Sequence, residues 1–99
     1  MKRINIVFDD NLDDVDILSV PDFIADNIEQ ITQQFFNWVA DPNNSKRWTY
    51  TDQSGRTVLG IGTEEFLWWL NNILSDGDSY AAVYREHTAF RVEYPSAEF

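Results

Sequence analysis

The sequence predicts a single α+β domain in which two helices pack on one face of a mainly antiparallel sheet. A length of 99 residues fits one domain and leaves no room for two. Two segments carry apolar residues every three or four positions, which predicts helices. Several shorter segments alternate apolar and polar residues or are rich in β-branched residues, which predicts strands. Their order is β-α-β-β-α-β-β, and helices on one side of a sheet bury such stripes most simply.

The first strand is predicted over residues 2–8, where Ile4, Ile6 and Phe8 alternate with their neighbours. We interpret residues 9–18 as an acidic connection, because the segment is too charged for a core element.

The first helix is predicted over 21–40, with Ser19 as its cap and Pro21 in its first turn. Residues 41–44 then end it with Pro and Asn. Its apolar face comprises Phe23, Ile24, Ile28, Ile31, Phe35, Trp38 and Val39.

The second helix is predicted to follow Thr63 as its cap and to stop at 75–78. Its core-facing residues are Phe66, Trp69, Leu70, Ile73 and Leu74.

The remaining segments predict two hairpins and a tail. One hairpin joins 47–52 to 56–61, and the other joins 79–85 to 89–94. Residues 95–99 are interpreted as a tail.

The composition excludes several classes of protein. There is no cysteine, which excludes a disulfide scaffold, a thiolate metal site and a cysteine nucleophile. No apolar run approaches the roughly 20 residues of a membrane span, and the first one ends at Asp9, too early for a signal peptide. We therefore expect a cytoplasmic location.

The net charge of −10 is concentrated in the first half of the chain. Residues 4–45 contain nine acidic residues and no Lys or Arg. Like-charge repulsion disfavours nucleic acid and anionic membranes as direct partners and favours a basic protein surface. The alternative is a solvated face that keeps the protein soluble.

Candidate catalytic and metal motifs are weak. Asp9–Asp10 and Glu64–Glu65 are adjacent pairs, whose side chains point in different directions. The stretch from Asp9 resembles a calcium loop at its first, third and fifth positions, but lacks the glycine at the sixth and the glutamate at the twelfth. His87 is the single histidine. We expect no enzyme activity, cofactor or metal.

Some aromatic residues lie off the predicted core. Trp68 falls about 160° from the centre of its helix's apolar stripe. It is either an exposed interface anchor or covered by a terminal strand or the tail. Trp48 with Tyr50, and Tyr80 with Tyr84, form core or an aromatic platform.

The chain as a whole resembles the small acidic immunity proteins of bacterial toxin systems, of the contact-dependent-inhibition and nuclease-colicin types. It shares with them its size, the lack of cysteine, the acidic run from Asp9 to Asp26, and aromatics such as Trp38 and Trp68. The resemblance implies a cytoplasmic inhibitor of a basic toxin domain, often a nuclease. It includes no diagnostic motif that assigns a role to a particular residue.

We therefore predict a protein that binds and neutralises a basic protein partner. The alternative is a phage-type nucleic-acid mimic that blocks a DNA-binding host protein. The oligomeric state stays open. The predicted interface comprises Asp9, Asp10, Asp13, Asp14, Asp16, Asp22, Asp26, Glu29 and Trp68.

Overall fold

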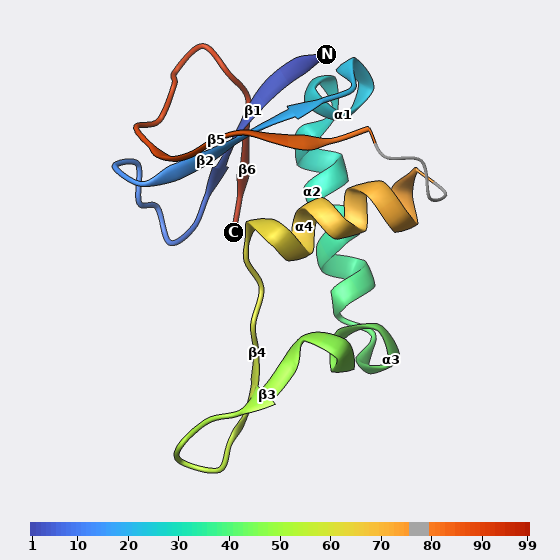
Figure 1. Ribbon diagram of the computed structural model, residues 1–99. Helices are drawn as coiled ribbons and strands as arrows, with labels where there is room; N and C mark the ends of the chain where they lie inside the picture. The colour runs from blue at the N-terminus through green and yellow to red at the C-terminus, as the bar shows by residue number, and fades with distance from the viewer. Residues whose placement is uncertain (76–79) are drawn as a thin grey trace.

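The computed structural model describes residues 1–75 and 80–99 and has the predicted α+β class (Figure 1). Its main sheet has four strands in the order β5-β2-β1-β6. Their bounds are β1 Lys2–Val7, β2 Val15–Val20, β5 Ala82–Thr88 and β6 Ser96–Glu98. The sheet is mixed, because β1 pairs antiparallel with β2 but parallel with β6, whereas β2 and β5 are antiparallel.

The interpretation of residues 9–18 as a connection is wrong for its second half, which forms β2. Val15, Ile17, Leu18 and Val20 are all buried, so this strand is covered on both faces. Asp16 is the one charged residue within β2, and its carboxylate is hydrogen-bonded. The charge that argued against a core element lies in the loop before the strand.

The second predicted hairpin is also wrong. β5 pairs with β2, and residues 89–95 cross the sheet face opposite the helices. There Phe90 and Tyr94 pack against Val7, Val15 and Ile17. The predicted tail contains β6, whose Ala97 is fully buried.

Asn5 explains why residues 91–95 take this path. It is fully buried in β1. Its Nδ2 donates to the carbonyls of Arg91 and Tyr94 at 2.9 and 3.1 Å, and its Oδ1 accepts from the Arg91 N–H at 3.1 Å. A buried amide requires such partners, and here they are backbone groups of one distant segment.

The first predicted helix is interrupted. It forms α1 (Asp22–Asp26) and α2 (Ile28–Val39), with Asn27 at φ −126° between them. The Asn27 side chain donates to the Phe23 carbonyl at 2.8 Å, the kind of local bond by which Asn competes with helix continuation. Ser19 lies in β2 and caps nothing.

The predicted apolar face of this helix is largely confirmed. Ile24, Ile28, Ile31, Phe35 and Val39 are buried, and Trp38 is half-buried. Phe23, in α1, is the exception, because it is 50% exposed.

The first predicted hairpin exists but is shorter. After α3 (Pro42–Ser45) and the 3₁₀ helix η1 (Lys46–Trp48), the strands are β3 (Thr49–Thr51) and β4 (Thr57–Leu59). They pair only with each other among the described residues and extend away from the rest of the chain (Figure 1).

The second helix begins as α4 (Thr63–Trp69) and continues as the π-helical turn η2 (Leu70–Leu74). Gly62, not Thr63, occupies the cap position, and its N–H donates to the Glu65 carboxylate at 2.8 Å. The wider π turn shifts the apolar face, so Ile73 is 39% exposed rather than buried. The helix was predicted to end at 75–78 and the next strand to begin at 79. Residues 76–79 lie outside the residues that the structure describes.

The main core lies between the sheet and the two longer helices. Ile4 and Ile6 of β1 share one buried cluster with Phe35 of α2 and Phe66 of α4. The Phe35 ring lies 5.2 Å from that of Phe66. Both helices thus cover one face of the sheet, as predicted.

Candidate protein-binding surface

The turn after β1 presents the first two predicted interface residues. Asp9 and Asp10 have φ values of 54° and 56°, and the Asn11 N–H closes the turn on the Phe8 carbonyl at 3.0 Å. Two successive positive φ values define a type I′ turn, which favours Gly, Asn and Asp. Both side chains are exposed.

A β-bulge brings β5 to the same end of the sheet. Val15 pairs with Thr88 and Ile17 with Arg85, so Glu86 and His87 both lie opposite the single residue between Val15 and Ile17. His87 has φ 51°, and its ring faces the loop before β2. Bulges commonly redirect side chains in this way.

Asp16 joins three elements at this bulge. Its Oδ1 accepts the N–H of His87 at 3.1 Å, and its Oδ2 accepts the Thr63 hydroxyl at the start of α4. Asp16 is half-buried, and both of its oxygens are hydrogen-bonded within the protein. The structure thus gives this predicted interface residue a structural position.

Two shallow hollows lie on either side of Asp16 and His87. One, of about 270 Å³, is lined by Asp9, Asp14 and Phe8 among others. The other, of about 260 Å³, is lined by residues including Glu64, Glu65, Glu86 and Val83. No Lys or Arg of the described chain lines either hollow. We call this end of the molecule the acidic corner: Asp9, Asp10, Asp13, Asp14, Asp16, Glu64, Glu65 and Glu86.

His87 is the titratable basic side chain at the centre of the acidic corner. Its Nδ1 lies 2.9 Å from Asp14 Oδ1. This hydrogen bond, with the negative charges of Asp14, Asp16 and Glu86, raises the pKa of His87 above its usual value of 6.5. The imidazole therefore keeps its proton to a higher pH than an isolated one.

Asp22 and Asp26, two of the remaining predicted acidic residues, lie at the opposite end of β1. Asp26 binds Lys2 at 2.6 Å, and Asp22 lies 3.3 Å from the amino group of Met1. β1 has six residues, so its ends are about 20 Å apart at about 3.3 Å per residue. That exceeds the Debye length of about 8 Å at physiological salt. The predicted interface is thus two separate acidic groups.

Trp68 belongs to neither group. It is half-buried, and its ring lies 5.8 Å from that of Trp48 and 6.2 Å from that of Trp38. The Arg47 guanidinium carbon lies 4.7 Å from the Trp68 ring centroid. Among the described residues, the rings and the cation that contact Trp68 belong to neither the tail nor a terminal strand. The residues around it come from α2 and η1, two segments whose approach the helical wheel does not reveal.

Sequence reasoning missed three residues of the acidic corner, Glu64, Glu65 and Glu86, and the histidine beside them, His87. The start of the second helix was predicted, but not that it lies against β2. The bulge that brings Glu86 and His87 there has no sequence motif.

Among the described residues, no three His, Cys, Asp or Glu side chains are placed to hold a metal ion. No helix in the same part of the chain is long and apolar enough to cross a membrane. No protein-family model, curated protein or solved structure matches this sequence.

Proposed function

We propose that the protein binds a basic protein partner through the acidic corner and inhibits it, in the manner of a toxin-immunity protein. One observation carries the proposal: eight carboxylate residues from the β1–β2 loop, β2, β5 and α4 share one end of the molecule, around two hollows that no Lys or Arg of the described residues lines. A cationic protein surface is the natural complement of such a field.

The corner also offers apolar contacts. Leu12 is 49% exposed within the acidic loop, and Val83 is 39% exposed beside the second hollow. Phe8 lines the first hollow. In protein interfaces, apolar anchors slow dissociation, whereas charge mainly accelerates association, up to about 10⁸–10⁹ M⁻¹ s⁻¹ at low salt.

The second candidate is a nucleic-acid mimic that blocks a DNA-binding protein. The turn that carries Asp9 and Asp10 favours this second candidate, because exposed carboxylates on a turn can take the place of the phosphate groups of DNA. The two candidates differ in what holds the complex together. A mimic depends mainly on charge, whereas an immunity protein uses Leu12, Phe8 and Val83 as well.

Salt and DNA competition separate the two candidates. The immobilised protein is exposed to lysate of its source cells, and bound proteins are eluted first with salt and then with duplex DNA. We expect the unmodified protein to retain one basic protein at high salt. The Leu12→Ala variant should lose that protein under the same conditions. Several proteins displaced by DNA would favour the mimic, and an empty matrix would contradict both candidates.

A further inference from the structure

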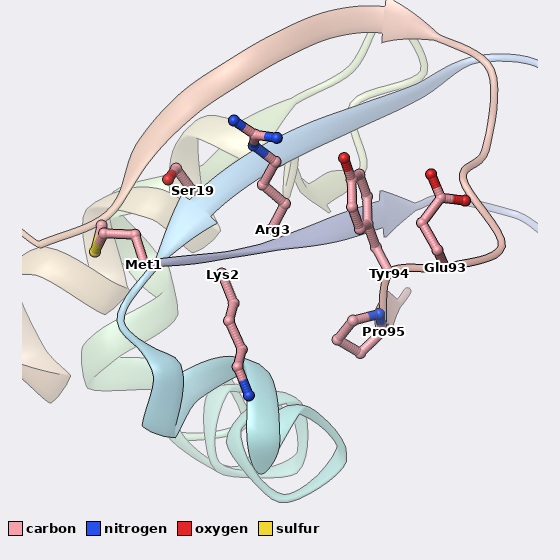
Figure 2. Close-up of a pocket in the computed structure, with 7 residues that line it drawn as sticks. All are labelled: Met1, Lys2, Arg3, Ser19, Glu93, Tyr94 and Pro95. Atoms are coloured by element: carbon pink, nitrogen blue, oxygen red, sulfur yellow. The ribbon is translucent and has the colours of Figure 1, made fainter.

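A third hollow, of about 450 Å³, lies at the opposite end of β1 from the acidic corner. It opens between the start of β1, the end of β2 and the segment that crosses the sheet (Figure 2). Its volume is within the range of small-molecule sites. It is lined by Met1, Lys2, Arg3, Ser19, Glu93, Tyr94 and Pro95.

Two of the cations around this hollow are already engaged. Lys2 points away toward α1 (Figure 2), where it binds Asp26 at 2.6 Å. The Met1 amino group lies 3.3 Å from Asp22. Arg3 differs, because it forms no ion pair with any described residue.

The carboxylate in the lining is also engaged. Glu93 is bound by the guanidinium of Arg91, with both Nε and Nη2 2.8 Å from its Oε1. The hydrogen bond from its own backbone N–H, followed by this bond to Arg91, lowers the pKa of Glu93. With that pair neutralised, Arg3 supplies the one uncompensated charge in the described lining.

Arg3 is held in place by an aromatic ring. Its guanidinium carbon lies 3.7 Å from the centroid of Tyr84. Stacking engages the face of the planar guanidinium and leaves its N–H edge available for a two-oxygen acceptor. The hydroxyls of Ser19 and Tyr94 have no hydrogen-bond partner among the described residues, and Tyr94 stands beside Arg3 (Figure 2).

We propose that this hollow binds the carboxylate of a small organic monoanion. Arg3 donates two parallel hydrogen bonds to the carboxylate, and the Ser19 and Tyr94 hydroxyls complete its coordination. The Tyr94 ring and Pro95 contact the apolar body of the ligand. A single positive charge matches a monoanion, whereas a phosphate dianion would leave one charge uncompensated in a protein of net charge −10. This site is independent of the proposed partner at the acidic corner.

The test is an NMR titration of the ¹⁵N-labelled protein with benzoate, with benzamide and inorganic phosphate as controls. We expect saturable shifts at residues 2–3, 19 and 93–95 with benzoate, and binding about tenfold weaker for benzamide, which lacks the charge. Equal binding of benzamide, tighter binding of phosphate, or no saturable shift with benzoate would overturn the proposal.

A matched pair of variants locates the charge. Arg3→Met and Arg56→Met remove the same charge, but Arg56 lies next to β4, far along the extended hairpin. We expect Arg3→Met to weaken benzoate binding about tenfold and Arg56→Met to change it by less than about twofold. Tyr94→Phe keeps the ring and should weaken binding by about threefold. Equal losses in the two arginine variants, or full affinity in both Arg3→Met and Tyr94→Phe, would contradict the assignment.

Discussion

The carboxylate of Asp16 accepts a hydrogen bond from the hydroxyl of Thr63, 47 residues further along the chain. This bond ties β2 to the first residue of α4. The second oxygen of Asp16 binds the β5 bulge through the His87 N–H. One half-buried side chain thus holds together the three elements that form the acidic corner.

Asp16→Ala should therefore destabilise the fold by about 2–3 kcal/mol. It removes two hydrogen bonds to a charged carboxylate and leaves the Thr63 hydroxyl and the His87 N–H without that acceptor. Asp13→Ala is the control, since Asp13 is exposed in the same loop, and it should cost less than about 0.5 kcal/mol. Urea unfolding measures both. Equal stabilities would show that Asp16 is not a structural residue.

Asn5→Ala should cost about 2–4 kcal/mol, because it removes three hydrogen bonds to the segment of Arg91 to Tyr94 and leaves backbone groups unsatisfied. Asn37→Ala, on the exposed face of α2, should change stability by less than about 0.5 kcal/mol. Hydrogen exchange at residues 91–97 should accelerate in Asn5→Ala alone. Unchanged protection there would contradict the role given to Asn5.

Phe99 tests whether the end of the chain belongs to the core. Its ring lies 5.0 Å from Phe8 and 5.1 Å from Phe66. Phe99→Ala should cost about 2–3 kcal/mol, somewhat below the value for a fully buried Phe. Phe23→Ala, at an exposed position, should cost about 1 kcal/mol or less. Thermal unfolding compares them, and a smaller loss at Phe99 than at Phe23 would refute the packing.

The ionisation of His87 should make stability depend on pH. Asp14 raises the pKa of His87 in the folded state, so its stabilising contribution is complete below about 6.5, the unfolded value, and is lost as pH rises through the folded pKa. His87→Asn tolerates the positive φ and should remove this dependence. An NMR titration of the imidazole measures the pKa directly, and a value of 6.5 or below would exclude the Asp14 interaction.

Local patterns predicted two of the elements that form the core. The stripe through Ile28, Ile31 and Phe35 indicated α2, and alternation around Ile4 indicated β1. β2 was missed because the charge around it suggested a loop, and because Val15, Ile17, Leu18 and Val20 do not alternate strictly with polar residues. β6 was missed because three residues at a chain end have no periodicity, although their pairing with β1 buries Ala97.

The acidic residues of the predicted interface are neighbours in sequence but form two separate groups in space. Residues 9–16 do gather at one end of the sheet, because a hairpin brings them together. Asp22 and Asp26 follow β2 to its other end, since Val20 pairs with Lys2, and Glu29 lies further along in α2. Counting charges along the sequence does not show that β2 carries the chain to the other end of the sheet between the two acidic groups.

The most direct measurement of the central proposal compares two variants of equal charge in partner capture. One carries Asp9→Asn, Asp10→Asn and Asp13→Lys, with Asn chosen because it tolerates the positive φ of both turn residues. The other carries Asp22→Asn, Asp26→Asn and Glu29→Lys. Each change to Asn raises the net charge by one and each change to Lys raises it by two. The net charge of both variants therefore rises by the same amount from −10.

We predict that the first variant loses about tenfold or more in affinity for the captured basic protein, whereas the second stays within about threefold of the unmodified chain. Urea unfolding confirms that both variants remain folded. Equal losses in the two variants would show that binding responds to net charge alone. A larger loss in the second variant would place the interface at the Asp22 end of the sheet and contradict the acidic corner as the binding surface.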